Sequence, residues 1–465
     1  MIEMTAAQIA AATGGRVVGD PDARVLAPAV VDSRLVAPGA LFVALAGERT
    51  DGHDHAPGAV AAGATVVLAA REVDVPSLVV VDDVQEALGA LARTVLARLR
   101  AAGDLRVVGI TGSVGKTTTK DLVGQLLRAH GPTVVPVGSF NNEIGLPLTV
   151  LEATTDTRFL VLEMGASGVG HLTYLTSIAP PDVSVVLAVG SAHLGEFGGI
   201  EAVARAKSEI VTGLAPGGVA VLNADDPRVA AMAERAPGEV VTFGTVTSAV
   251  VRADDVTVDE AGRTTFRVSH AGEQAQVRLR LVGEHHVGNA LAALTVGRTL
   301  GLPLDRLAAD LADAVPLSPH RMQVTERADG VTVIDDSYNA NPESMRAALR
   351  ALAVVAGRRR RSVAVLGEML ELGDDSRERH DEVGRLAVRL NVKLLVVVGG
   401  AAWPIFDGAQ MEGSWGEEVV QVADVAEAKA LLDSTLTAGD VVLVKASHGS
   451  GLWRLADELV AGERG

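Results

Sequence analysis

The chain has 465 residues, 48% of them hydrophobic and 21% charged, so we expect a folded protein that is too long for one core. Its net charge of −17 disfavours nucleic acid and acidic membranes as partners, because both would repel it. The sequence contains no cysteine, which excludes disulfides, thiolate nucleophiles and cysteine-ligated zinc.

The first residues, MIEMTAAQIAAATGG, have no basic stretch and include Glu3, so they do not resemble a signal peptide. No uncharged apolar run reaches the length of a membrane span. We therefore predict a cytoplasmic protein with no membrane-spanning segment.

The predicted elements fall into three segments, 1–85, 86–315 and 316–465. In the first, apolar runs predict strands at 40–45, 63–70 and 77–83. A helical pattern follows from Val84 to Ala102, and the middle segment then alternates strands with helices up to about residue 245. The strands expected in this alternating part are 105–110, 159–163, 183–189 and 218–223.

After residue 245 a more polar, alternating stretch predicts antiparallel strands, and the proline-containing stretch 301–322 is expected to be a linker. The last segment alternates strands and helices again. Such alternation predicts parallel sheets covered by helices, and hence three α/β domains. The elements expected in the last segment are strands at 331–335, 362–366, 392–398 and 440–444 and helices near 342–355, 376–390 and 424–435.

The stretch GITGSVGKTTTKD (109–121) predicts a phosphate-binding loop between a strand and a helix. It departs from the generic pattern, because Ile110 stands where that pattern has glycine. Glycines let backbone N–H groups approach phosphate, Lys116 would reach the β- and γ-phosphates, and Thr117 would bind Mg²⁺. A turn without a ligand is the plain alternative, but the run G-K-T-T at a helix start favours a nucleotide.

Two further polar residues follow strands of the same predicted sheet, Glu163 and His193. Ligands collect at the carboxyl ends of parallel strands, so a nucleotide, an acid and a histidine should meet at one edge. Glu163 is a suitable Mg²⁺ ligand because hard cations prefer carboxylate oxygen.

Lys207 lies on the apolar face of the predicted helix around GGIEAVARAKSEIVTGL. A lysine in this position either extends its ammonium outward to solvent or has a special role. Periodicity alone favours the outward arrangement.

These motifs together resemble the ATP-dependent Mur ligases, which build the peptide of bacterial peptidoglycan. The glycine spacing G-x-x-G-x-x-G-K-T-T resembles that family's own form of the loop, and the resemblance extends from about residue 30 to 450. Several segments resemble the member of the family that acts last. The stretches that carry the resemblance are EMGA, GSAHL, ARAKSEI, SFNNEIGLPLT, HRM, DDSYNANPESM, LGEMLELG and DSRLVAPGALFVALAGERTDGHD.

The resemblance implies an N-terminal domain for a UDP-sugar, a central P-loop ATPase-type sheet and a C-terminal Rossmann-like domain. It implies that ATP converts the carboxylate of UDP-N-acetylmuramoyl-tripeptide to an acyl phosphate, which the amine of D-alanyl-D-alanine then attacks. It further implies a monomer with two Mg²⁺ ions and a carbamylated Lys207, which would explain a lysine on an apolar face.

The resemblance also assigns roles to individual residues. Thr117 and Glu163 would bind one Mg²⁺, His193 and carbamylated Lys207 the other, and Lys116, Lys207, His193 and Arg321 would be catalytic. The residues implied to bind ATP are Gly112, Ser113, Gly115, Lys116, Thr117, Thr118, Asn289, Arg321 and Asp336. The residues implied to bind the other substrates are Ser33, Arg34, Asp51, Gly52 and His53 for the uridine nucleotide, Asn142 and Glu143 for the tripeptide, and Tyr338, Asn339 and Asn341 for the dipeptide.

Three positions depart from the family pattern: Ala188 and His286 stand where asparagine is usual, and His448 where arginine is common. Loop chemistry alone also accounts for many of the N- and C-terminal site residues, since Asp, Asn and Gly favour turns. Two other functions stay open: a related ligase that adds a single amino acid, and a nucleotide-dependent switch without ligase chemistry. The tripeptide's third residue is open between lysine and diaminopimelate.

Overall fold

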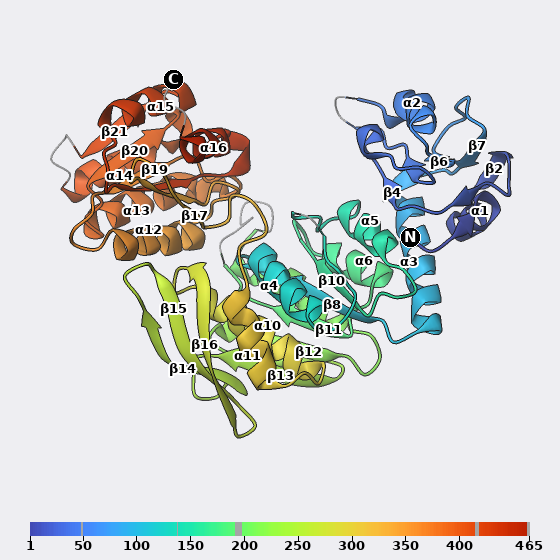
Figure 1. The fold of residues 1–465 in the computed structure, drawn as a ribbon, viewed down its shortest axis with the longest axis horizontal. Coiled ribbons are helices and arrows are strands. Elements are labelled where there is room, and N and C mark those ends of the chain that lie inside the picture. Colours follow the sequence, from blue (N-terminus) through green and yellow to red (C-terminus); the bar gives the residue numbers. More distant parts are fainter. Residues whose placement is uncertain (48–49, 137, 191–197, 414–417, 463–465) are drawn as a thin grey trace.

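The computed structural model describes residues 1–47, 50–136, 138–190, 198–413 and 418–462. Its strands form three large sheets, one in each of the three predicted segments, and a small two-stranded pair. The expectation of three α/β domains is confirmed. Figure 1 shows the N-terminal and C-terminal sheets on opposite sides above the central one. Among the described residues, no helix has both the length and the apolar character needed to cross a membrane.

The N-terminal sheet has five strands in the order β2-β7-β6-β5-β4. All neighbouring pairs are parallel except β2 with β7. Its inner positions are fully buried, as the apolar runs of the sequence predict. The elements of this part are β1 (Met4–Thr5), α1 (Ala6–Thr13), β2 (Arg16–Gly19), β3 (Arg24–Val25), β4 (Ala29–Val30), β5 (Leu41–Val43), α2 (Ala56–Ala61), β6 (Val66–Ala69) and β7 (Ser77–Val80).

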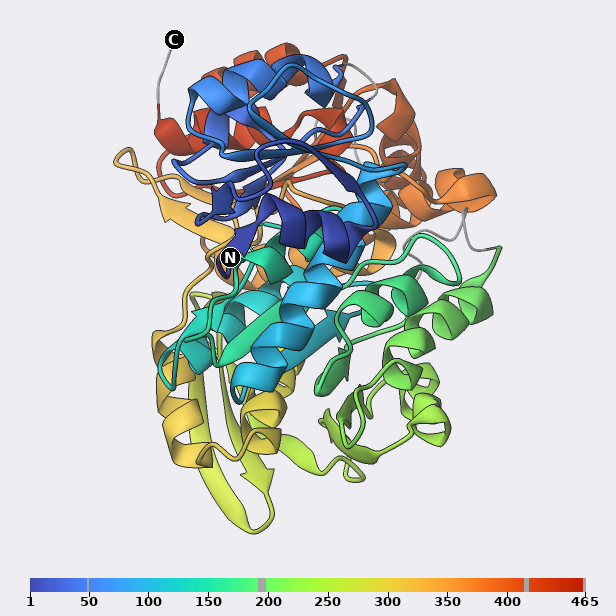
Figure 2. The same ribbon diagram turned by 90° about the vertical axis from the view of Figure 1, so that its right-hand side faces the viewer.

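Helix α3 (Val84–Ala102) connects the N-terminal part to the centre of the molecule. Asp83 caps its first turn by accepting from the backbone of Glu86. Leu88 and Leu91 of α3 belong to one apolar cluster that contains residues of both parts. Figure 2 shows α3, in light blue, running along the central layer. The N-terminal part is therefore packed onto the central one.

The central sheet has nine strands in the order β16-β15-β14-β13-β12-β11-β8-β10-β9. Its pairs from β9 to β14 are parallel, and β14, β15 and β16 pair antiparallel, as the sequence predicts. The strands are β8 (Arg106–Thr111), β9 (Thr133–Val134), β10 (Phe159–Glu163), β11 (Val183–Val186), β12 (Val219–Asn223), β13 (Glu239–Gly244), β14 (Val251–Val258), β15 (Arg263–His270) and β16 (Glu273–Val282). The helices are α4 (Lys116–Arg128), α5 (Gly145–Glu152), α6 (His171–Ile178), α8 (Ile200–Thr212), α9 (Pro227–Ala230), α10 (His286–Thr299) and α11 (Leu304–Asp313).

Helix α11 corrects the expectation that residues 301–322 form a linker. Leu304, Leu307 and Leu311 lie on one face of this helix and are buried in the central core. Three leucines at helical spacing form an amphipathic face, and that signal outweighs the prolines at its two ends. The connection to the C-terminal sheet is therefore limited to the residues after Asp313.

The C-terminal sheet has six strands in the order β17-β18-β22-β19-β20-β21, and its pairs are parallel except β17 with β18. Helices α14 and α16 and strands β17 and β21 were not expected from the sequence. The strands are β17 (Gln323–Glu326), β18 (Thr332–Asp335), β19 (Ser362–Leu366), β20 (Leu394–Val398), β21 (Val419–Val422) and β22 (Val441–Lys445). The helices are α12 (Pro342–Ala356), α13 (Ser376–Arg389), α14 (Trp403–Glu412), α15 (Val425–Thr435) and α16 (Trp453–Ala461).

Candidate active site

The glycine-rich loop joins β8 to α4 at the carboxyl edge of the central sheet. Gly112 and Gly115 have φ of 157° and 82°, values that side chains rarely allow. A β-carbon on Gly115 would lie 2.5 Å from Oδ1 of Asn289, so this glycine is also required by a close approach. The loop therefore has the compact backbone that a phosphate cradle needs.

Helix α4 begins without a capping side chain. Its first-turn N–H groups point toward the loop, and the helix dipole adds partial positive charge there. The Lys116 ammonium donates a hydrogen bond to the Gly112 carbonyl at 2.8 Å. Burial lowers the pKa of Lys116, and the nearby Arg321 contributes in the same direction while Glu163 opposes it. This end of the helix is therefore suited to bind an anion.

Thr117, Glu163 and Asn141 form a hydrogen-bonded group beside the loop. The Thr117 hydroxyl donates to Oε2 of Glu163 at 2.9 Å, and the Asn141 amide donates to Oε1 at 2.7 Å. Glu163 is only 1% exposed, at the end of β10. A buried carboxylate and a hydroxyl at this distance are the oxygen ligands that Mg²⁺ prefers, so the residues present fit one such ion.

Lys207 is buried in α8, with 2% of its surface exposed, so the outward arrangement favoured by periodicity is wrong. Burial, and to a smaller extent the Lys116 charge, lowers the pKa of Lys207 from 10.5 to about 7. A large fraction of the amine is therefore neutral near pH 7. His193, its predicted partner at a second metal site, lies outside the described residues.

The opposite wall of the site comes from the C-terminal part. Arg321 Nη2 lies 3.3 Å from the Thr117 hydroxyl and donates to it, and its guanidinium lies 4.2 Å from the centre of the Tyr338 ring. Oδ2 of Asp336 lies 2.5 Å from the buried Lys445 ammonium. Burial lowers the pKa of Lys445 despite this partner.

A cavity of about 500 Å³ separates these two walls. It is lined on the central side by the phosphate loop, Glu163 and Asn289, and on the other side by residues of the C-terminal part. Gly112 and Lys207 are not among the residues that line this cavity. The predicted site residues that line the cavity are Ser113, Gly115, Lys116, Thr117, Thr118, Glu163, Asn289, Arg321, Asp336, Tyr338, Asn339 and Asn341.

A second cavity of about 380 Å³ adjoins the first, and Lys116 and Asn141 line both. Asn142 and Glu143, the residues predicted for the tripeptide, lie on its wall opposite the start of α3. The Asn142 side chain accepts from the backbone of Gly145 at 2.9 Å and so holds the start of α5. An elongated ligand in the second cavity would thus reach the phosphate loop at Lys116.

The residues predicted for the uridine nucleotide lie on the N-terminal part and line neither cavity. Asp51 Oδ1 lies 2.5 Å from Nδ1 of the buried His53, whose Nε2 accepts from the Ala70 backbone. The His53 backbone N–H, followed by its side chain, lowers the pKa of Asp51 to about 2. Gly52 is required locally, because a β-carbon there would lie 2.6 Å from the Leu45 carbonyl.

Ser33 and Arg34 lie in a short 3₁₀ turn, Ser33–Leu35, of the same N-terminal part. The Arg34 side chain is 87% exposed and pairs with Asp32 at 2.6 Å. The hydrogen bond from Arg34 lowers the pKa of Asp32 to about 2. The role of these residues in nucleotide binding stays a prediction.

Three further site residues serve the local backbone. Asn341 caps α12 by accepting from the Ser344 N–H at 2.9 Å, and the Asn339 side chain accepts from the Ala340 N–H at 2.8 Å. Asp336 accepts from the Met322 N–H at 3.2 Å as well as pairing with Lys445. These bonds fix the shape of the wall on which Tyr338 lies.

The three departures from the family pattern are accommodated locally. Ala188 contributes its backbone carbonyl, which accepts from Ser113 at 2.9 Å, so no side chain is needed there. His286 Nδ1 lies 3.2 Å from the Asn289 amide nitrogen and orients that amide. His448 stacks on Trp453, with ring centres 5.7 Å apart. None of these changes removes a group from the phosphate loop.

Sequence reasoning missed several lining residues. Asn141 stands next to the predicted Asn142, but no sequence signal shows that its side chain, rather than its neighbour's, contacts Glu163. Lys445 ends the apolar strand VVLVK. A cation at the carboxyl end of a parallel strand indicates a ligand-binding position, so the sequence did contain a signal for this residue. Ser139 and His285 also line the cavity.

The sequence was compared with models of known protein families. Three models match this chain. The model described as "Mur ligase family, catalytic domain" matches residues 30–103, and the one described as "Mur ligase middle domain" matches residues 110–297. The one described as "Mur ligase, glutamate ligase domain" matches residues 320–448. Together these matches cover most of the chain.

Individual proteins are similar over nearly the whole length. A protein of Mycobacterium leprae named UDP-N-acetylmuramoyl-tripeptide–D-alanyl-D-alanine ligase is 48% identical over 99% of each chain, and one of the same name from Bacillus subtilis is 34% identical over 92% of each. The crystal structure of MurF from Acinetobacter baumannii superposes with a TM-score of 0.87 at 32% identity over 99% of each chain. MurF ligase from Thermotoga maritima in complex with ADP gives 0.80 at 33% identity over 94% of this chain and 98% of that one. This chain belongs to the Mur ligase family.

Proposed function

We propose that this chain uses ATP to join D-alanyl-D-alanine to UDP-N-acetylmuramoyl-tripeptide, forming the UDP-linked pentapeptide of peptidoglycan synthesis. The observation that carries the proposal is the meeting of two cavities at Lys116 and Asn141, beside the phosphate loop. One cavity is lined by the phosphate loop, Asn289 and Asp336, and Gln85 and Glu86 at the start of α3 line the other. The names of the similar proteins supply the identity of the two substrates.

The reaction needs ATP because a carboxylate at neutral pH is a poor electrophile. An oxygen of the tripeptide carboxylate attacks the γ-phosphorus, the bond to ADP breaks, and an acyl phosphate forms. The neutral amine of the dipeptide then attacks the acyl carbon, loses a proton, and expels inorganic phosphate. The first step brings two anions together, and the second builds negative charge on the tetrahedral intermediate and the leaving phosphate. Positive groups on both sides of the transferred phosphoryl group are therefore the main catalytic requirement.

The two walls supply those groups. Lys116 and the uncapped first turn of α4 approach from the central side, and Arg321 approaches from the C-terminal side. The Arg321 contact with Thr117 places the guanidinium at the same end of the cavity as the loop. Asn289 would contact the adenine and Asp336 the ribose, as the resemblance implies.

Thr117 and Glu163 would hold one Mg²⁺, which when bound neutralises phosphate charge. Carbamylated Lys207 and His193 would hold the second ion, although His193 lies outside the described residues. The low pKa of Lys207 supports this assignment, because CO₂ adds only to a neutral amine. A carbamate also converts a buried cation into the oxygen ligand that Mg²⁺ prefers.

The remaining substrate contacts follow the family assignments. Asn142 and Glu143 would border the tripeptide, and the wall around Tyr338, Asn339 and Asn341 would receive the dipeptide. Ser33, Arg34, Asp51, Gly52 and His53 would build the uridine-nucleotide site. We further propose that the chain is cytoplasmic, where ATP and UDP-linked precursors are found, and that it acts as a monomer.

Phosphate release from ATP tests this function when each substrate is omitted in turn. We expect inorganic phosphate and the UDP-linked pentapeptide to appear in equal amounts only when ATP, the UDP-linked tripeptide and the dipeptide are all present. A single amino acid should not replace the dipeptide. Phosphate release that is unchanged without the dipeptide would contradict the ligase function and favour a nucleotide-dependent switch.

A further inference from the structure

Arg321 lies between two residues with an unusual backbone conformation. His320 has φ of 58° and Met322 has φ of 50°, and both carry a β-carbon. Histidine adopts this left-handed region more often than most residues, but a methionine there is an outlier that persists only where surrounding contacts enforce it. The loop that presents Arg321 is thus held in place from outside.

Two consecutive carboxylates at the end of β18 provide the contacts. Oδ2 of Asp335 lies 2.7 Å from Nδ1 of His320, and Oδ1 of Asp336 accepts from the Met322 N–H at 3.2 Å. The Tyr338 N–H also donates to the His320 carbonyl, at 3.2 Å. The residues on both sides of Arg321 are therefore bound to the same strand end.

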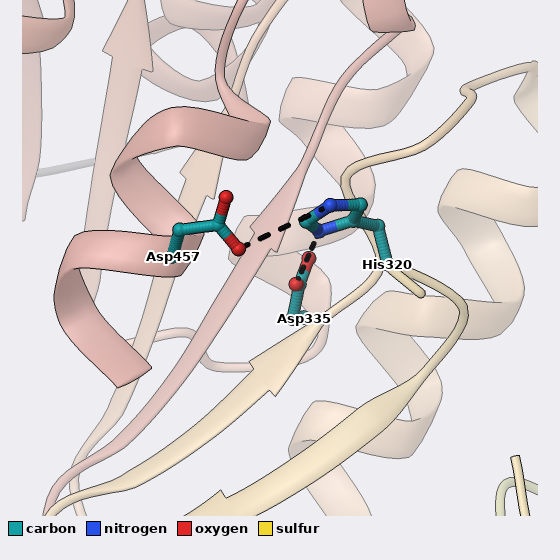
Figure 3. A group of neighbouring side chains, drawn as sticks. All are labelled: His320, Asp335 and Asp457. Carbon is teal, nitrogen blue, oxygen red and sulfur yellow. Dashed lines mark hydrogen bonds and ion pairs between the residues drawn. The ribbon is translucent and has the colours of Figure 1, made fainter. Parts of the chain in front are cut away.

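Asp335 is well suited to hold the imidazole. It is 3% exposed, and its other oxygen accepts from both the backbone N–H and the hydroxyl of Ser337, at 3.1 Å and 2.6 Å. A carboxylate with these donors is fixed and leaves Oδ2 to accept from Nδ1–H of His320. Figure 3 shows the Asp335 and Asp457 side chains both pointing toward the ring of His320. The Asp457 oxygen is 4.0 Å from Nε2 and its side chain is 58% exposed, so Asp335 is the stronger partner.

The central part also holds the chain just before this loop. The Ser318 N–H donates to Oδ2 of Asp121 at 2.9 Å, and Asp121 belongs to α4, the helix that begins at the phosphate loop. The short stretch from Ser318 to Met322 is thus fixed to both walls of the cavity. Small changes in this stretch would move the Arg321 guanidinium away from Thr117.

We infer that His320 and Asp335 are positioning residues, whose hydrogen bond fixes the loop so that Arg321 reaches the transferred phosphoryl group. This inference rests on the proposed function, in which Arg321 contacts the γ-phosphate. Neither His320 nor Asp335 touches the substrates in this account. Their effect passes through Arg321 alone.

A double-mutant cycle separates this role from a general effect on stability. His320→Ala should lower kcat by about 10-fold to 100-fold, because a misplacement of about 1 Å is enough for such a loss. Its KM for the UDP-linked tripeptide should change little, whereas its Tm should fall by a few degrees, because the buried Asp335 loses a donor. Asp335→Asn should lower kcat in the same way. His320→Asn should retain most activity, since asparagine tolerates the left-handed region and its amide can donate to Asp335.

The decisive comparison is His320→Ala made in an Arg321→Ala background. If His320 acts through Arg321, the second change adds no further loss of kcat. If the two losses of kcat multiply in the double variant, or if His320→Ala keeps full turnover, the inference is overturned. Full turnover of Arg321→Ala would instead contradict the proposed phosphate contact. Asp457→Asn is the matched control and should keep normal kcat; a loss equal to that of His320→Ala would overturn the inference by showing that the cluster acts as a unit.

Discussion

Replacement of Lys116 by alanine is expected to lower ligase turnover by about 10²–10³-fold, the effect of removing one group that stabilises charge in a transition state. Lys116 starts α4 and lies where the two cavities meet. In the proposed function its charge would face both the γ-phosphate of ATP and the carboxylate of the tripeptide. The other lysine of the stretch 109–121, Lys120, is buried and pairs with Asp121 at 2.7 Å.

The variant should remain folded, because the Lys116 side chain makes one hydrogen bond, to a loop carbonyl, and is not part of an apolar core. Turnover is measured as phosphate release, and Tm serves as the control for folding. Lys393→Ala is a matched substitution, since Lys393 is exposed and bonds only locally to Asn391. Near-normal turnover of Lys116→Ala would show that the loop is not the site of phosphoryl transfer.

Lys207→Arg and Lys207→Ala are each expected to lower ligase turnover by about 10²–10³-fold or more. Arginine keeps positive charge and reach, so it would preserve activity if Lys207 acted as a cation. It cannot form a carbamate, because its guanidinium stays protonated. Acetate at high concentration should partly restore Lys207→Ala by supplying carboxylate oxygens in the vacated space, and should not restore Lys207→Arg.

The effect of pH provides a second measurement on the wild-type chain. The pKa of Lys207 is about 7, so its neutral fraction rises as pH increases through that value. When bicarbonate is removed and then added back, activity should therefore recover. The recovery should be more complete at pH 8 than at pH 6, two values that lie about one unit on either side of that pKa. Arg205→Ala, on the exposed side of α8, is the control for helix integrity. An active Lys207→Arg variant would refute the carbamate.

The sequence predicted the parts of the fold that depend on local pattern. Apolar runs at 159–163 and 362–366 form strands β10 and β19 with the expected bounds, because buried parallel strands have a continuous apolar signal. Helix α11 was not predicted, because the prolines near its two ends favour a linker although three leucines recur at helical spacing. The predicted domain limits at 85 and 315 stay predictions.

The candidate site was predictable where residues follow a strand or form a motif, as with Lys116, Thr117 and Glu163. The direction in which side chains point was not predictable from the sequence. Lys207 is buried although lysines on an apolar face usually extend outward, and its low pKa depends on neighbours that are distant in sequence. The bond between His320 and Asp335 likewise joins two elements through a turn with an unusual backbone, which no local pattern indicates.

The transfer of oxygen from substrate to phosphate tests the central claim most directly. The terminal carboxylate of the UDP-linked tripeptide is labelled with ¹⁸O, the ligase reaction is run with ATP and D-alanyl-D-alanine, and the inorganic phosphate is analysed by mass. An acyl phosphate requires a carboxylate oxygen to bond to the γ-phosphorus and to leave with it. We therefore predict one labelled oxygen in each phosphate released. Unlabelled phosphate, whose fourth oxygen then comes from water, would contradict the acyl phosphate and the ligase mechanism built on it.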